Sequence, residues 1–136
     1  MSKLSRRNFV SKSGLVAAAA LATPAMALAA QDDKDIFIHH VYFWLKNPES
    51  AEDKKKLVEG LQKLSSVKTI QKFYIGKPAD TNRDVIDRSY SISWMLMFKN
   101  KADQDSYQVD PIHLNFVKEC SSLWQKVIVY DSVSAV

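Results

Sequence analysis

A tyrosine and a histidine occur at a spacing that could support proton transfer. The segment Tyr107-Gln108-Val109-Asp110-Pro111-Ile112-His113 puts a phenol just before a predicted helix and an imidazole in its first turn. A helix N-terminus disfavours the imidazolium, so His113 is expected to be neutral and able to accept a proton. Tyr107 could orient or polarise a carbonyl, which would complete an acid–base pair. In the structural alternative, His113 begins the core stripe of the helix and bonds a backbone carbonyl, while Tyr107 only packs.

Two further histidines, His39 and His40, are adjacent in a predicted strand. Neighbouring side chains of a strand point to opposite faces, so these two cannot chelate one metal ion together. His39 shares its face with Phe37, Val41 and Phe43, and could meet the histidine of the later helix if helices cover that face. Two histidines without a nearby paired carboxylate make a poor metal site, and we expect no metal.

The other residue types that carry chemistry give weaker signals. Cys120 is the only cysteine, so an intrachain disulfide is excluded, and its apolar surroundings favour a core residue over a reactive thiol. The three glycines are too far apart to form a phosphate-binding loop. The sequence therefore predicts no bound cofactor.

Hydrophobic patterns and turn residues predict the elements that must position these side chains. Ser50 with Asp53 resembles a capping box, and Asp110 followed by Pro111 is typical of a helix start. The expected elements are a strand over 35–45, a helix to about residue 66, a strand over 69–75, a loop over 79–89, a strand over 90–98, a short helix over 100–107, a helix from Pro111 that includes Trp124, and a strand over 126–131.

The order β-α-β-β-α-β predicts an α+β fold of the ferredoxin-like type, with one antiparallel four-stranded sheet and helices on one face. The first strand is apolar on both faces, so the second face also needs a cover. A second copy of the sheet would bury an apolar surface that includes Tyr42, Trp44, Met95, Met97 and Ile128. We therefore expect a homodimer through the sheet face, closed as a dimeric α/β barrel.

The start of the chain is typical of a twin-arginine export signal. Arg6 and Arg7 precede an alanine-rich apolar stretch that ends in small residues near Ala29 and Ala30. This stretch is shorter than the roughly 20 residues of a spanning helix, so we expect no stable membrane insertion once residues 1–30 are removed. The expected location is the periplasm or cell envelope.

Removal of this signal changes the charge of the chain. Of the 19 lysines and arginines, the four in residues 1–30 would be lost, and the remaining 15 equal the 15 aspartates and glutamates. A neutral domain gives no support for nucleic-acid binding. The expected organisation is a signal peptide over 1–30, a short linker over 31–35 and one domain over 36–133.

Several segments together resemble the stress-responsive dimeric α/β-barrel (Dabb) family. They are His39 to Lys46, Phe73 to Gly76, Phe98, the Tyr107-x-x-x-Pro111-x-His113 pattern, Trp124 and Val127 to Asp131. The resemblance spans essentially all of residues 36–132. It implies a ferredoxin-like protomer, a dimer that closes a barrel, and a small pocket between sheet and helices in each subunit.

The resemblance also implies site residues. In a plant polyketide cyclase of the family, a tyrosine and a histidine form the acid–base pair, and they fall on Tyr107 and His113. The implied pocket positions in this chain are His39, Val41, Phe43, Phe73, Ile92, Phe116 and Trp124. Ile92 stands where that cyclase has a second pocket histidine, and the larger Phe73 and Val117 should shrink the cavity.

Two functions follow as hypotheses. The first is a non-enzymatic or small-ligand-binding protein of the cell envelope that holds a small apolar compound. The second is a cofactor-independent enzyme, such as a cyclase, isomerase or small oxygenase, with His113 as the base, Tyr107 as the hydrogen-bond donor and His39 orienting the substrate. The cavity beside His113 distinguishes them: a volume of several hundred Å³, as in usual ligand sites, would favour the enzyme, and a filled core would favour the first hypothesis.

Overall fold

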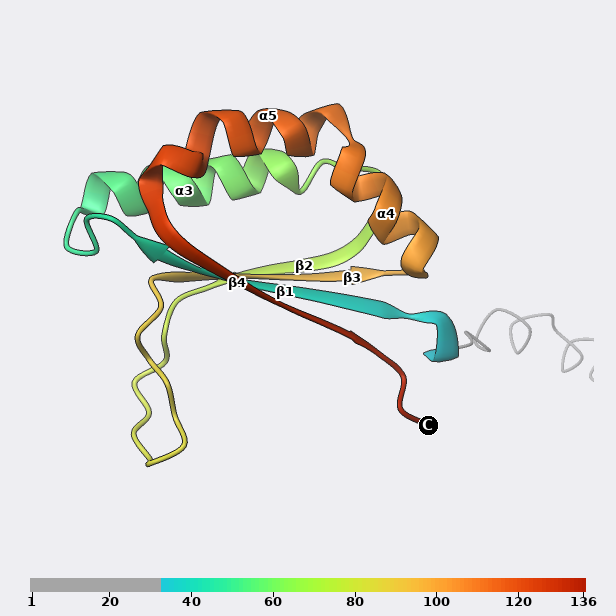
Figure 1. Ribbon diagram of the computed structural model, residues 1–136, viewed down its shortest axis with the longest axis horizontal. Helices are drawn as coiled ribbons and strands as arrows, with labels where there is room; N and C mark the ends of the chain where they lie inside the picture. The colour runs from blue at the N-terminus through green and yellow to red at the C-terminus, as the bar shows by residue number, and fades with distance from the viewer. Residues whose placement is uncertain (1–32) are drawn as a thin grey trace, which may run out of the picture. The chain divides into compact units, whose positions relative to one another are not determined.

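The computed structural model describes residues 33–136, and Figure 1 shows a sheet with helices along one side. The predicted export signal lies outside the described residues. The elements are η1 (Asp33–Asp35), β1 (Phe37–Leu45), α3 (Ala51–Leu64), β2 (Ile70–Gly76), β3 (Ile92–Phe98), α4 (Lys101–Val109), α5 (Pro111–Cys120), η2 (Ser121–Leu123) and β4 (Trp124–Val133). No helix within residues 33–136 combines the length and apolarity needed to cross a bilayer.

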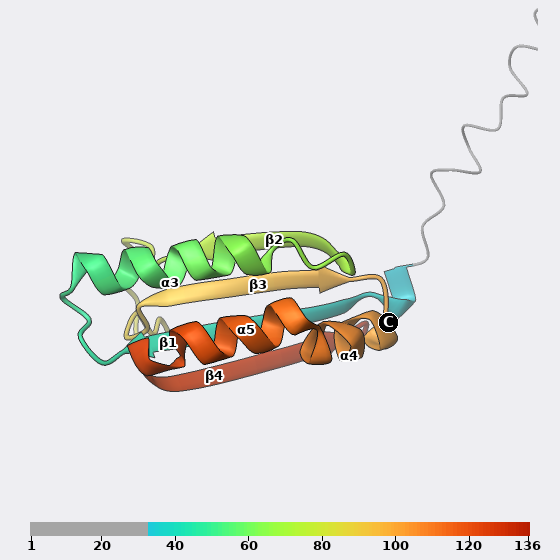
Figure 2. The same ribbon diagram turned by 90° about the horizontal axis from the view of Figure 1, so that it is seen from above.

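The strands pair in one antiparallel sheet in the order β2-β3-β1-β4. α3 lies over β2 and β3, whereas α5 lies over β1 and β4, so the helices cover one face (Figure 2). This arrangement is the ferredoxin-like fold, and it confirms the predicted α+β class. β4 is longer at both ends than expected, because it pairs with β1 from Phe37 opposite Val133 to Leu45 opposite Trp124.

Three side-chain caps set where the helices begin. The Asp53 backbone N–H donates to Ser50 Oγ at 3.1 Å at the start of α3, which confirms the predicted cap. Asn100 accepts in the same way at the start of α4. Asp110 accepts from the Ile112 backbone N–H at 2.8 Å, and proline occupies the first turn of α5. These caps fix the relative positions of α4 and α5, which meet at Asp110.

The last helix ends earlier than the sequence predicts. α5 stops at Cys120, Ser121 is its C-cap, and a short 3-10 turn leads into β4 at Trp124. The expectation that Trp124 belongs to the helix is wrong, because two serines follow Cys120 and serine is a weaker helix former than alanine or leucine. The Trp124 ring still faces the helices: its centroid lies 4.9 Å from that of Phe43 and 5.8 Å from that of Phe116.

The hydrophobic core lies between the helices and the sheet. Its most enclosed side chains have no exposed surface, and they are Leu45, Leu57, Leu61, Leu96 and Phe98. α3 and α5 pack tightly at Gly60, where an added Cβ would lie 2.6 Å from Cys120 Sγ. Cys120 is free and buried here, as expected for a core residue.

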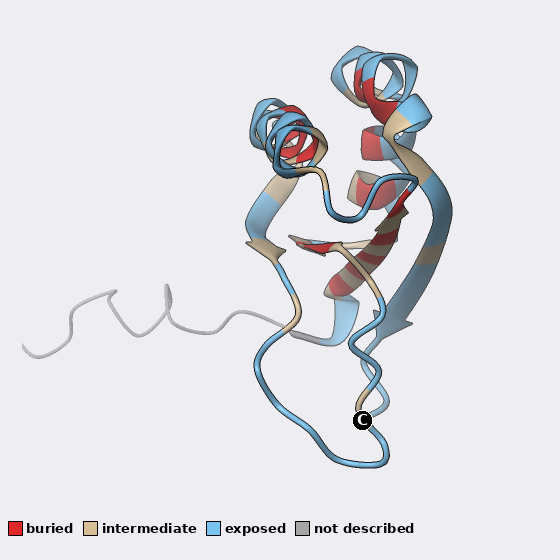
Figure 3. Cartoon of the chain, turned by 90° about the vertical axis from the view of Figure 1, so that its left-hand side faces the viewer, coloured by how far each residue is buried: buried red, intermediate tan, exposed pale blue. Residues whose placement is uncertain are grey.

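The other face of the sheet, called the open face below, is covered by no helix of residues 33–136 (Figure 3). Alternate residues of the strands form it: Ile38, His40, Tyr42, Trp44, Lys72, Tyr74, Gly76, Ser93, Met95, Met97, Lys126, Ile128, Tyr130 and Ser132. The loop of residues 77–91 extends from the sheet on this side, away from the helices (Figure 1). It is tied back where Trp44 Nε1–H donates to Ser89 Oγ at 3.0 Å and where the Tyr90 ring contacts Tyr42.

Candidate functional site

A small cavity lies between the sheet and the helices α4 and α5. Its volume is about 180 Å³, which is below the roughly 300–1,000 Å³ of pockets that take drug-sized ligands. The lining residues are His39, Val41, Phe43, Trp94, Tyr107, Gln108, His113, Phe116, Val117, Trp124, Val127 and Val129. Most of this lining is apolar, and the ionisable groups in it are two imidazoles and one phenol.

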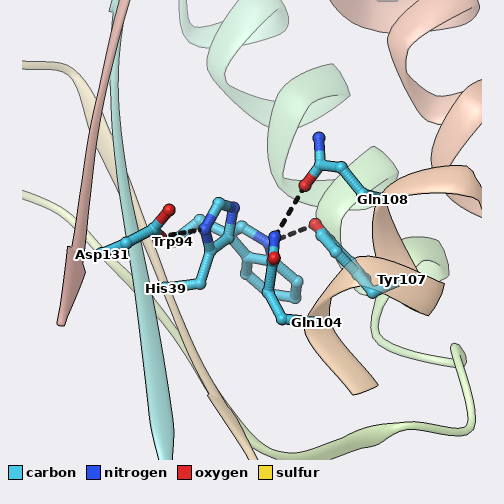
Figure 4. Close-up of polar contacts among 6 residues, drawn as sticks. All are labelled: His39, Trp94, Gln104, Tyr107, Gln108 and Asp131. Carbon is cyan, nitrogen blue, oxygen red and sulfur yellow. Dashed lines mark hydrogen bonds and ion pairs between the residues drawn. The ribbon is translucent and has the colours of Figure 1, made fainter. Parts of the chain in front are cut away.

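His39 projects from the middle of β1 under the helices and is almost fully buried. Its Nδ1 atom lies 2.5 Å from Asp131 Oδ1 on β4, because the antiparallel register places these two residues opposite each other. An ionised carboxylate can only accept, so Nδ1 carries the proton and donates it. In the neutral form of the ring, Nε2 carries the lone pair, and Figure 4 shows this second nitrogen pointing away from Asp131 toward the helices.

His113, in the first turn of α5, is held in the corresponding tautomer. Its Nδ1 lies 3.0 Å from the backbone carbonyl oxygen of Gln108, and that oxygen can only accept. Nε2 of His113 is therefore also a lone-pair acceptor. Burial lowers the pKa of His113 below the ordinary value for histidine and His39 lowers it further, while the Gln108 carbonyl and Asp110 act in the opposite direction.

Tyr107 lies between the two histidines and is fully buried. Its ring centroid is 4.7 Å from that of His113 and 5.8 Å from that of His39. The Trp94 Nε1–H donates to the Tyr107 hydroxyl at 3.2 Å, so the hydroxyl proton is free to point elsewhere (Figure 4). Burial raises the pKa of Tyr107 well above its usual range, with the Trp94 hydrogen bond opposing the shift in part. Tyr107 is therefore a hydrogen-bond donor and not a base.

His39, His113 and Tyr107 thus offer different hydrogen-bonding groups within one mostly apolar cavity. Two imidazoles can each accept a proton at Nε2, and one phenol can donate a hydrogen bond. A neutral compound with a carbonyl or hydroxyl oxygen matches this set, because the oxygen can accept from Tyr107 while a nearby proton faces an imidazole.

The structure brings most of the predicted site residues to this cavity. His39, Val41, Phe43, Tyr107, His113, Phe116 and Trp124 all line it. Phe73 and Ile92 do not. Phe73 is on the edge strand β2, and the strand order places this strand at the opposite edge of the sheet from β4. The Phe73 ring packs there against Trp94, with 5.6 Å between the ring centroids. Ile92 is buried in the core at the start of β3.

Several residues of the site were not predicted from the sequence. Asp131 is 92 residues from His39, and only the β1–β4 register brings their side chains together. The alternation of Val127, Val129 and Asp131 does place these residues on one face of the last strand. That pattern cannot give the register, so the partner of His39 could not be identified. From the sequence alone, Trp94 likewise could not be distinguished from an ordinary aromatic residue of the core.

The described residues contain no evident metal centre. Within residues 33–136, no group of three or more histidine, cysteine, aspartate or glutamate side chains could hold a metal ion. His39 and Asp131 form only a pair, and the carboxylate is partly exposed at the sheet edge.

Comparison with solved structures shows similar folds at low sequence identity. A Dabb family protein from Mesorhizobium loti has a TM-score of 0.63 and 22% identity, with 75% of this chain and 99% of that chain covered. A hydroxynitrile lyase from Passiflora edulis has a TM-score of 0.62 and 20% identity, covering 74% and 94%. A dimeric ferredoxin-like protein of unknown function from Bacteroides fragilis has a TM-score of 0.57 and 17% identity, covering 73% and 96%.

No curated protein matches the chain. The family model for the stress responsive A/B barrel domain, by contrast, matches residues 37–134, which include all four strands and the whole cavity. The chain therefore belongs to the stress responsive A/B barrel (Dabb) domain family.

Proposed function

We propose that the chain is a homodimeric protein that binds one small neutral compound, with a carbonyl or hydroxyl group, in the cavity of each protomer. The observation that carries this proposal is the convergence of Tyr107, His39 and His113 on one small apolar enclosure. Packing of an apolar core does not require two imidazoles with free acceptor nitrogens. The volume of about 180 Å³ limits the ligand to a compact molecule.

Binding can be tested with two compact carbonyl compounds, butanone and benzaldehyde, by calorimetry and by thermal shift. Tyr107→Phe should weaken affinity about 5-fold, since one net hydrogen bond contributes about 1 kcal/mol. Tyr74→Phe is the matched control, because it removes a phenol from the open face and should leave affinity unchanged. If neither compound binds, or if both variants bind equally well, the cavity is not the site.

A second candidate function is cofactor-independent acid–base catalysis, and the contact between His39 and Asp131 favours it. By holding the ring proton of His39 on Nδ1, Asp131 leaves Nε2 to accept a hydrogen bond from a substrate and so to orient it beside His113. Proton removal from a carbonyl compound, or from the hydroxyl group of a cyanohydrin, would suit this arrangement. The hydroxynitrile lyase from Passiflora edulis has the same fold, although its low identity supports the fold alone.

Within this second function, His113 is the proposed base, Tyr107 the hydrogen-bond donor to the substrate oxygen, and His39 the residue that orients the substrate. Since its pKa is lowered, His113 should stay neutral until the pH falls below the ordinary histidine value of 6.5. Activity should therefore persist at neutral pH and decline on acidification.

Exchange of the α-protons of butanone for deuterium in heavy water measures proton transfer directly, by NMR. His113→Asn should reduce a catalysed exchange rate at least about 100-fold, as expected for loss of a general base. Binding of butanone without exchange would support the binding function and contradict catalysis. An unchanged exchange rate in His113→Asn would remove His113 from the mechanism.

The homodimer is supported by the open face. Aromatic residues and methionine are enriched in protein interfaces, and this face combines four of them, Tyr42, Trp44, Met95 and Met97, in a half-buried state in the protomer. Fold neighbours from Bacteroides fragilis, Thermobifida fusca and a Jannaschia species are described as dimeric. Pairing of two open faces would bury these side chains and close an α/β barrel.

Export to the periplasm or cell envelope rests on the sequence of residues 1–30. Replacement of Arg6 and Arg7 by lysine should abolish export of a fused reporter that is active only outside the cytoplasm. Export of the doubly substituted chain at the original level would contradict a twin-arginine route.

A further inference from the structure

His40 lies at the centre of the open face. In the cross-strand row that contains it, Tyr130 is on one side, and Met95 and Tyr74 follow on the other. Its burial in the protomer is intermediate, so part of the ring is still accessible. A second sheet packed on this face would cover the rest, whereas His39 is already buried under the helices of its own protomer and the half-buried His113 lies on α5, on the opposite side of the sheet.

The His40 ring makes specific contacts with its neighbour on the same strand. It stacks on Tyr42 with a centroid distance of 4.4 Å and an interplanar angle of 29°. Nδ1 of His40 lies 3.2 Å from the Tyr42 hydroxyl. The Tyr42 ring in turn contacts Tyr90 and Tyr130 edge to edge or edge to face. His40 is therefore part of an aromatic cluster on the open face.

No acidic side chain in the described sheet can compensate a charge on His40. The charged residues of the open face are Lys72, opposite Met97, and Lys126, opposite Trp44, and both are cations in other rows. Asp87, in the loop, lines a hollow together with Tyr42, Trp44, Lys126 and Tyr130, and Lys126 is the cation that shares this hollow with it. The titratable groups that contact or flank His40 are phenols, which ordinarily ionise near pH 10, and His39 on the opposite face.

We propose that the homodimer assembles in a pH-dependent way, because protonation of His40 in both subunits places two uncompensated charges between the sheets. This inference rests on the proposed pairing through the open face. A buried charge without a partner is costly, so the charged form favours the separated subunits.

The direction of the effect follows from proton linkage. Burial lowers the pKa of His40 below 6.5 already in the protomer, and the nearby His39 lowers it further. Covering the ring in the dimer adds desolvation and lowers the pKa again. The separated subunits therefore bind protons more readily than the dimer, so affinity is highest at neutral pH and falls as the pH drops below the protomer value.

Sedimentation analysis of the full chain between about pH 8 and about pH 5 tests the proposal, since this range covers histidine titration. The dissociation constant should rise by up to about 100-fold per pH unit within the titration range, because separation takes up two protons. His40→Phe keeps an aromatic ring without the titrating group and should give a dimer whose affinity is independent of pH. His40→Gln provides a second neutral variant if phenylalanine packs poorly, with circular dichroism to confirm folding.

The chain has three histidines, so substitution of a histidine away from the open face provides the control. His113→Asn should retain the pH dependence of assembly. A wild-type dimer with constant affinity over this range would overturn the inference while leaving the dimer intact, and so would pH dependence that persists in both His40 variants. A wild-type monomer at pH 8 would instead overturn the proposed homodimer, and the inference with it.

Discussion

The two faces of the sheet are formed by alternate residues of the same strands, yet they have different surroundings. On the helix-covered face, His39 is almost fully buried, hydrogen-bonded to Asp131 and close to Tyr107. On the open face, its neighbour His40 is half-buried and stacked on Tyr42. One residue step along β1 thus separates a buried, hydrogen-bonded imidazole from an imidazole that is partly exposed on the open face.

The difference shows how one strand can contribute alternate side chains to the core of the protomer and to a surface suited to association. The helices α3, α4 and α5 cover one face of the sheet within the protomer (Figure 2). They leave a small cavity that contains His39, Tyr107 and His113. The open face has no such cover among the described residues, so its aromatic and methionine side chains are stabilised best by association. Substitutions on the two faces should therefore affect different properties.

The largest effect is expected when a charge is placed on the open face. Met95→Asp should raise the dissociation constant of the dimer at least about 1,000-fold, since a buried unpaired carboxylate costs several kcal/mol. Light scattering at several concentrations would detect the monomer. Val85→Asp, at an exposed position of the loop, should remain dimeric. A dimer that survives Met95→Asp would show that the subunits pair elsewhere.

A smaller effect, on folding rather than assembly, is expected on the covered face. Leu96→Ala removes a fully buried core side chain and should lower the free energy of unfolding by about 3 kcal/mol. Met97→Ala, one residue later on the open face, should lower it by about 1 kcal/mol under conditions where the protein is monomeric. Chemical denaturation of both variants measures the comparison. Equal losses would indicate that the two faces are buried alike in the protomer.

The smallest effect should come from a helix cap that supports the covered face. Asp110→Ala removes the acceptor for the Ile112 backbone N–H and should cost about 1 kcal/mol of stability. Asp110→Asn should recover most of this loss, because asparagine is also a good N-cap residue. Thermal unfolding of the two variants gives the measurement, and equal destabilisation would show that the cap has no specific role.

The sequence was sufficient to predict the order of the elements, the topology and the face that several cavity residues occupy. Alternation in β1 placed His39 and His40 on opposite faces, and the Asp110-Pro111 pair placed His113 in the first turn of α5. These features are local, since they depend on residues close together in the chain.

The features that could not be predicted depend on how distant segments meet. The pairing of His39 with Asp131 requires the β1–β4 register, and the hydrogen bond from Trp94 to Tyr107 requires the position of α4 over β3. Phe73 was expected in the pocket but lies on the β2 edge, because the strand order separates β2 from β4. Local patterns specify which face a residue occupies, whereas tertiary packing decides which neighbours it meets.

Nitrogen NMR of the three histidine rings tests most directly whether the two faces serve separate purposes. Addition of butanone should shift the resonances of His39 and His113, which line the cavity, and leave His40 unchanged. Dilution through the dimer–monomer transition should shift His40 and leave the other two unchanged. A ligand response at His40, or a dilution response confined to His39 and His113, would contradict this assignment of the two faces.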